Sequence, residues 1–186
     1  IDVVGTTEEW KYVRDANMAM GRFLSPVDIE NNELSVVLGS SVAEALFSQN
    51  DPIGESLRIS IAGGRVSFNF QVIGVMSPRS GNEGLELNDQ VYIPVTALQS
   101  RLRRFLRNAD GEIIINQIVL QTSPDADKAI VKQLISEVLI YKHQVTEPDF
   151  TIQSQDDLIG AATEVSNTLS LLLGSVAGIS LLVGGI

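Results

Sequence analysis

The sequence predicts an α+β protein that ends in a transmembrane helix, and three observations lead to this fold class. Strand-like and helix-like patterns alternate irregularly over the first 164 residues, which favours α+β over a regular α/β arrangement. Residues 66–72 alternate apolar and polar side chains, as a half-buried strand does. Residues 165–186 carry no charge, and roughly 20 apolar helical residues cross a bilayer core.

The elements of the first third are a helix, a strand and a second helix. Thr7 can cap a helix predicted over about 8–20, which Gly21 ends. The apolar run 34–38 predicts a buried strand. A Gly-Ser-Ser sequence then leads into a helix that ends near Phe47.

The middle of the chain predicts a hairpin followed by a loop. Strands are expected at 56–61 and 66–76, joined around Gly63-Gly64, because a Gly-Gly pair accepts the positive φ values of a tight turn. Residues 78–88 contain Gly and Asn and predict a loop.

The remaining soluble part predicts alternating strands and helices. Strands are expected at 91–94, 112–122 and 149–153, with helices at 96–106 and 126–139. The second of these helices has apolar residues at 3.6-residue spacing, which predicts an inward face that includes Leu134. Ser154 can cap a last helix that continues into the membrane segment.

Residues 165–186 have two interpretations, a truncated transmembrane helix and a buried core helix. A core helix normally carries a charged polar stripe, and this segment has none. Ser170, Gly174 and Gly178 lie four residues apart, a small-residue ridge that lets membrane helices approach closely. The alternative is that glycine is simply frequent in membrane helices.

Composition excludes several classes of function. The 186 residues hold 13 basic and 23 acidic side chains, a net charge of −10, with one His and no Cys. A chain without Cys cannot build disulfides, cysteine-ligated zinc sites or a cysteine nucleophile. The acidity argues against a nucleic-acid partner, because phosphate binding needs clustered cations.

No catalytic, cofactor or metal site is predicted. Residues 38–42 resemble a nucleophile elbow, but Ala43 stands where that motif needs Gly. His143 is interpreted as a surface residue at a helix end. Asp156 and Asp157 do not share a helix face, so they are interpreted as helix N-terminal charges rather than as paired carboxylates.

Four arginines gather within seven positions, at Arg101, Arg103, Arg104 and Arg107. They are either a contact for acidic lipid or an acidic partner, or the solvated face of an amphipathic helix. Neither interpretation makes an enzyme.

A series of motifs, in order along nearly the whole chain, resembles MacB-like ABC transporter permeases. GRFLS at 21–25 with Asp28 is similar to the family signature G-R-F-[FL]-[ST]-x-x-D. Further similar segments are VVLGS at 36–40, DPIG at 51–54, FQVIGV at 70–75, YIP at 92–94 and ISLLVGGI at 179–186. Residues 79–89 and 107–112 fit the family least.

The resemblance implies a split domain followed by a membrane helix. A Porter-like α+β subdomain would comprise 1–33 and 88–155, and a smaller Sabre-like α/β subdomain, 34–87, would be inserted in it. Residues 156–186 would be a connecting helix that runs into a truncated transmembrane helix at about 165–186. The chain is expected to be part of a longer membrane protein, with residues 1 to about 160 outside the cytoplasm and the helix in the inner or plasma membrane.

The resemblance also implies a function and partners. The domain would couple cytoplasmic ATP hydrolysis to an extracytoplasmic conformational change, supporting export of drugs, toxins, peptides or lipoproteins. The ATPase would be a separate or fused nucleotide-binding domain, so this chain would be neither an enzyme nor a cofactor carrier. Expected partners are that ATPase, a second permease copy, membrane lipid, and an extracytoplasmic adaptor or substrate protein.

Two other classes stay open at this point. One is the extracytoplasmic sensor domain of a membrane receptor, which would be followed by one helix and a signalling module. The other is a membrane-anchored hydrolase, which lacks a visible nucleophile and base.

Overall fold

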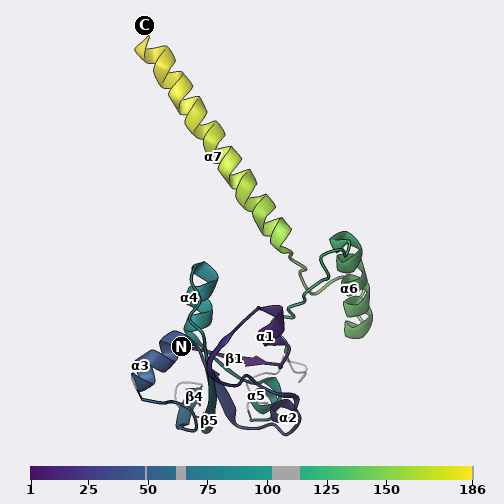
Figure 1. Ribbon diagram of the computed structural model, residues 1–186. Helices are drawn as coiled ribbons and strands as arrows, with labels where there is room; N and C mark the ends of the chain where they lie inside the picture. Colours follow the sequence, from purple (N-terminus) through teal and green to yellow (C-terminus); the bar gives the residue numbers. More distant parts are fainter. Residues whose placement is uncertain (49, 62–65, 102–113, 186) are drawn as a thin grey trace. The chain divides into compact units, whose positions relative to one another are not determined.

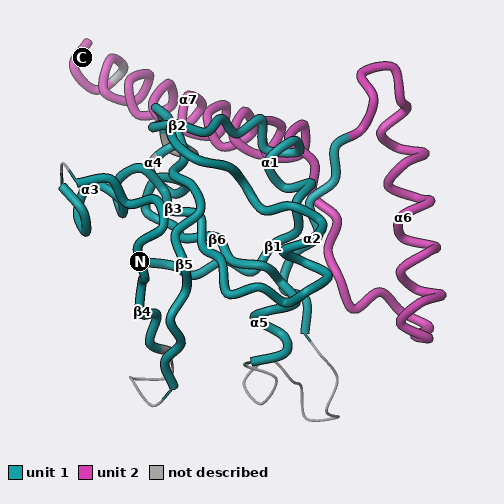
Figure 2. Tube along the Cα trace, turned by 60° about the horizontal axis from the view of Figure 1, so that its bottom comes forward, with its two compact units in different colours: residues 1–121 teal, residues 122–186 magenta. Residues whose placement is uncertain are grey.

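The computed structural model describes residues 1–186 except 49, 62–65, 102–113 and 186 (Figure 1). Two compact units, 1–121 and 122–186, make up the chain (Figure 2). In the first unit the strands are β1 (Asp2–Thr6), β2 (Met18–Gly21), β3 (Ser35–Leu38), β4 (Ser56–Ile61), β5 (Val66–Met76) and β6 (Gln90–Pro94). Its helices are α1 (Trp10–Val13), α2 (Pro26–Glu30), α3 (Ser40–Phe47), α4 (Asn82–Asn88) and α5 (Val95–Arg101).

The described strands of the first unit form one mixed sheet in the order β1-β6-β3-β5-β2, and β4 pairs antiparallel with β5. The turn predicted at Gly63-Gly64 between them lies outside the described residues. The β1–β6 and β3–β5 pairs are parallel, whereas β2–β5 and β3–β6 are antiparallel. A mixed sheet with helices confirms the predicted α+β class, and the strands predicted at 34–38, 56–61, 66–76 and 91–94 are confirmed.

β3 is buried on both faces of this sheet. Val36, Val37 and Leu38 have no exposed surface. Since successive residues of a strand point to opposite faces, Val36 and Leu38 belong to one hydrophobic cluster and Val37 to the other. An uninterrupted apolar run is therefore what this central position requires.

Helices complete the two clusters. Val42 and Ala43 of α3 pack with Val36 and Leu38. In the other cluster the Trp10 ring of α1 stacks on Phe23, with ring centres 5.8 Å apart, and lies 4.5 Å from the Tyr92 ring. Aromatic rings bury large apolar areas, so this trio anchors α1 to the sheet.

The helix predicted over 8–20 is wrong. The helical segment α1 stops at Val13, and the chain leaves it through Asp15 at a φ of 47°. Met18–Gly21 then forms β2, which pairs with β5. Pairing with a neighbouring strand has overridden the helical propensity of this segment.

Three other predicted elements differ from the structure. The predicted loop at 78–88 contains α4, which Asn88 ties back to Arg79 through two hydrogen bonds of 3.0 and 2.9 Å. The described residues 114–122 and 149–153 were predicted as strands but join no ladder. The helix predicted at 96–106 is observed as α5, and its last part lies outside the described residues.

The second unit holds two described helices, α6 (Lys128–His143) and α7 (Gln155–Gly184). Ser154 caps α7 in a reciprocal arrangement with Asp157, as predicted for Ser154. The face of α6 that was expected to point inward is exposed instead, since Ile130, Leu134 and Val138 keep 56–57% of their surface accessible.

The division into 1–33 with 88–155 and an inserted 34–87 stays a prediction. The single sheet interleaves strands from both predicted parts, because β3 and β5 lie between β6 and β2.

Candidate functional site

Each unit contains an arrangement of ion pairs around aspartates that the sequence had singled out. Among the residues that the structure describes, no group of three or more His, Asp or Glu side chains could hold a metal ion. The first arrangement surrounds Asp28 in the sheet unit, and the second joins α6 to the base of α7.

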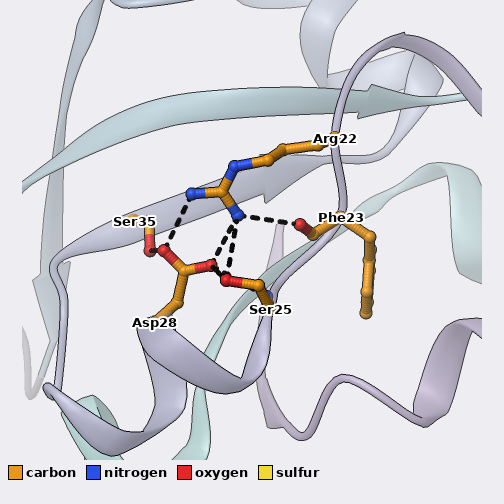
Figure 3. Close-up of polar contacts among 5 residues, drawn as sticks. All are labelled: Arg22, Phe23, Ser25, Asp28 and Ser35. Atoms are coloured by element: carbon orange, nitrogen blue, oxygen red, sulfur yellow. Dashed lines mark hydrogen bonds and ion pairs between the residues drawn. The ribbon is translucent and has the colours of Figure 1, made fainter.

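Arg22 and Asp28 form a two-pronged ion pair (Figure 3). One guanidinium nitrogen of Arg22, Nη2, lies 3.0 Å from Oδ1 of Asp28, and the other, Nη1, donates to Oδ2. The Ser25 backbone N–H also donates to Oδ2, at 2.8 Å. The Asp28 side chain is 6% exposed and that of Arg22 is 54% exposed, so the carboxylate is buried under a guanidinium that reaches solvent.

This network lowers the pKa of Asp28 well below its ordinary value. The hydrogen bond from Arg22 is the largest cause and outweighs the cost of burial, and the Ser25 hydrogen bonds add to it. Asp28 also closes the capping box of α2, with Ser25 as N-cap. The charged positions of the GRFLS-x-x-D segment thus stabilise the turn between β2 and β3.

The glycines of the same motif and of FQVIGV allow two backbones to cross. The Arg22 N–H donates to the Ile73 carbonyl at 3.0 Å. A Cβ on Gly21, whose φ is 66°, would lie 2.3 Å from that carbonyl oxygen. A Cβ on Gly74 would lie 2.2 Å from the Arg22 oxygen. Both contacts are too short for any side chain, so these motif glycines are explained by packing.

α7 is the described helix that is long and apolar enough, by length and composition, to cross a membrane, over Gln155–Leu181. Its charges, at Asp156, Asp157 and Glu164, all lie in its first ten residues. Residues 165–184 would span about 30 Å at the helical rise, which matches the hydrocarbon core. Leu171 and Leu181 are 76% and 81% exposed, so the described part of the chain does not cover this surface.

The predicted packing residues Ser170, Gly174 and Gly178 lie within α7 at one-turn spacing. A Cβ on Gly174 or Gly178 would meet no atom within 4 Å apart from the backbone of its own helix. The ridge is therefore open to a neighbouring helix, and its use for packing stays a prediction.

The predicted arginine cluster is described at one of its four positions. Arg101 is exposed in the last turn of α5. Arg103, Arg104 and Arg107 lie outside the described residues, so the contact predicted for the cluster stays a prediction.

Two lysines of α6 pair with the first turn of α7. The Lys128 ammonium lies 2.5 Å from a carboxylate oxygen of Asp156, and the Lys132 ammonium lies at the same distance from Asp157. Asp156 and Asp157 are helix N-terminal charges, as interpreted from the sequence. Their lysine partners were not predicted, although the one-turn spacing of the two lysines was a usable signal.

His143 stands in the last turn of α6 and is partly exposed, as expected for a surface residue at a helix end. Its Nδ1 lies 2.8 Å from Asp149, and its ring meets Phe150 edge-on at 6.1 Å. The segment between the helices is thereby tied to the end of α6.

Comparison with known proteins identifies the family. A model of the MacB-like periplasmic core domain matches residues 1–138. The macrolide export ATP-binding/permease protein MacB of Bdellovibrio bacteriovorus is 31% identical, over 99% of this chain and 27% of that protein. The protein with the same description from Azoarcus sp. (strain BH72) is 36% identical, over 95% of this chain and 25% of that protein. The chain thus spans about a quarter of the length of these relatives.

Two solved structures share the fold. The periplasmic region of MacB from Actinobacillus actinomycetemcomitans superposes with a TM-score of 0.66 and 23% identity, over 87% of this chain and 64% of that one. The extracellular domain of the noncanonic ABC-type transporter YknZ from Gram-positive bacteria superposes with a TM-score of 0.55 and 20% identity, over 78% of this chain and 66% of that one. The resemblance drawn from the motifs is confirmed, and the chain belongs to the family of MacB-like periplasmic core domains.

Proposed function

We propose that this chain is the extracytoplasmic domain, with the beginning of a membrane helix, of an ABC transporter permease. Its role is to couple ATP hydrolysis in the cytoplasm to a conformational change outside the membrane. The observation that carries the proposal is α7, which Figure 1 shows as an unbroken helix. It has 30 residues, with charges only in the first ten.

The continuity of α7 supports a mechanical role. A helix without a break can carry a displacement along its axis, whereas a flexible linker would absorb the displacement. Its charge-free part would lie in the hydrocarbon core, and its charged first turns would project into water. Residues 1 to about 160 would then be extracytoplasmic, in a protein of the inner or plasma membrane.

The partners follow from the same arrangement. The ridge of Ser170, Gly174 and Gly178 would pack against a neighbouring membrane helix, from the same permease or from a second copy. The arginines that begin with Arg101 would contact acidic lipid or an acidic adaptor. The ATPase would be a fused or separate domain, as the names of the relatives combine ATP-binding and permease functions.

The transported substrate is proposed only as a class. The names of the curated relatives refer to macrolide export. Drugs, toxins, peptides and lipoproteins are the class of cargo that we propose for the complete transporter.

A distance measurement in the full-length permease with its ATPase tests the proposal. The 186 residues contain no Cys, so cysteines introduced at Glu44 on α3 and Ala161 on α7, both exposed, are labelled selectively once any cysteines in the rest of the permease and in the ATPase are replaced. Trapping the ATPase with ATP and vanadate should change the distance between the labels, and vanadate without ATP should not change it.

Two results would contradict the proposal. An unchanged distance in every nucleotide state would remove the coupling role. A distance that responds to an extracytoplasmic ligand but not to ATP would instead favour a receptor sensor domain.

A further inference from the structure

We propose that α6 and the first turn of α7 form an electrostatic joint, in which Lys128 and Lys132 hold Asp156 and Asp157 so that both helices move as one body. The consequence for transport rests on the proposed function, whereas the joint itself rests on geometry alone.

The positions of the four charges match in pairs. Lys128 and Lys132 lie four residues apart and therefore share one face of α6. Each ammonium reaches a carboxylate oxygen of a different aspartate at 2.5 Å. The contacts lie one turn apart on α6 and at successive residues of α7. Two contacts restrict the direction of the helix end more than a single contact would.

Asp157 connects the joint to the helix backbone. Its carboxylate accepts the Ser154 backbone N–H at 2.9 Å as well as the Lys132 ammonium. The lysine therefore holds a group that already belongs to the cap of α7. A displacement of α7 acts on Lys132 through the Asp157 side chain, which its hydrogen bond with the Ser154 backbone holds in place.

The intervening segment is pinned at its other end. His143 and Asp149 lie 2.8 Å apart, and Phe150 packs edge-on against the histidine ring. Both ends of the connection between α6 and α7 are thus held, which limits how far the two helices can swing apart.

Exposed ion pairs are individually weak and are screened by salt. The side chains of Lys128 and Asp156 are 56% and 60% exposed, and those of Lys132 and Asp157 are 33% and 51% exposed. The joint therefore needs both pairs, and reversing both lysines should open it without unfolding either helix.

The test uses the full-length permease with its ATPase in lipid discs. Cysteines replace exposed Gln133 on α6 and exposed Ala161 on α7, and spin labels on them report the distance between the helices. Without nucleotide, the native charges should give one narrow distance population. The Lys128→Glu/Lys132→Glu variant should lose that population. The conservative Lys128→Arg/Lys132→Arg variant should keep it.

Lys142→Glu is the matched control, because Lys142 is an exposed α6 lysine in no ion pair among the described residues. It should leave the distance unchanged. A narrow population that survives the double reversal would overturn the joint, and so would a broad distribution with the native charges.

Comparing nucleotide states tests the joint and the proposed function independently. The 133–161 distance should stay the same between the nucleotide-free and vanadate-trapped states. A change in this distance would overturn the joint, even where ATP moves α7 relative to α3 as the proposed function requires. If ATP does not change the distance between α3 and α7, the proposed function fails. A narrow 133–161 distance without nucleotide would still support the joint.

Discussion

β3 and the charge-free part of α7 are both runs of apolar residues, but they face different surroundings. In β3 the protein itself covers Val36, Val37 and Leu38 completely. In α7, Leu171 and Leu181 are 76% and 81% exposed. A strand that is buried within a sheet needs only a few apolar residues, whereas a helix needs about 20 to cross a bilayer. The length of an apolar run thus indicates which environment covers it.

The largest expected difference comes from truncating one leucine in each region. Leu38→Ala should lower the free energy of unfolding of the sheet unit by about 2–5 kcal/mol, because it leaves a cavity between packed strands. Leu171→Ala should leave it unchanged. Trp10, the one tryptophan of the chain, packs in the sheet unit, so its fluorescence follows denaturant unfolding in detergent. Equal losses in both variants would contradict the distinction.

The next effect concerns the buried carboxylate. Asp28→Asn should lower the free energy of unfolding by about 1.5–3 kcal/mol, because hydrogen bonds to a charged group are weakened and Arg22 loses the charge of Asp28. Glu30→Gln changes an exposed carboxylate in the same helix and should cost nothing measurable. Denaturant curves followed by Trp10 fluorescence compare the two. An unchanged free energy of unfolding in Asp28→Asn would show that the network does not stabilise the turn.

Replacing a glycine by alanine should have opposite effects on stability in the two regions. Gly74→Ala should destabilise the sheet unit by about 1–3 kcal/mol, because its Cβ would meet the Arg22 carbonyl oxygen at 2.2 Å. Gly160→Ala, where a Cβ meets nothing within 4 Å, should increase the helicity of α7, since Ala exceeds Gly in helix propensity. Thermal unfolding by circular dichroism measures both effects. Destabilisation by Gly160→Ala would contradict its open setting.

The ion pair also gives the sheet unit a pH dependence. The pKa of Asp28 is lowered in the folded state, so its contribution is present above the unfolded pKa of about 4 and is lost as pH falls further. The stability difference between native protein and Asp28→Asn should be constant above about pH 5 and shrink below about pH 4. A difference that does not change down to pH 3 would contradict the lowered pKa.

The smallest effect on unfolding is expected on the membrane ridge. Gly174→Leu should leave the Trp10 unfolding curve unchanged, because a Cβ at Gly174 meets nothing within 4 Å among the described residues beyond its own helix. In the complete transporter it should reduce assembly and the coupling of ATPase activity, because a bulky side chain keeps neighbouring helices apart. Normal assembly and coupling would show that the ridge is not a packing face.

The sequence predicted the elements whose signal is local and strong. β3, the β5 strand and α7 follow from an apolar run, strict alternation and the absence of charge, respectively. β2 was missed because Met18–Gly21 has no strand pattern of its own and depends on pairing with β5. α4 was missed because Gly and Asn suggested a loop, whereas Asn88 closes it through hydrogen bonds to Arg79.

The charged contacts were likewise predictable only where they are local in the sequence. The capping role of Ser154 was predictable, since a cap acts on its own helix. The GRFLS-x-x-D motif was recognised, but the pairing of Arg22 with Asp28 became visible only in the folded turn. Lys128 and Asp156 are 28 positions apart, and a contact over that distance depends on the path of the intervening chain.

The central claim is that α7 passes from water into lipid near Glu164. Single spin labels at successive positions of α7, in lipid discs, test it by relaxation with oxygen and with a water-soluble nickel complex. We predict that positions before Glu164 are accessible to nickel, and that positions from Val165 onward become accessible to oxygen and shielded from nickel. Uniform nickel access along the whole helix would contradict the account.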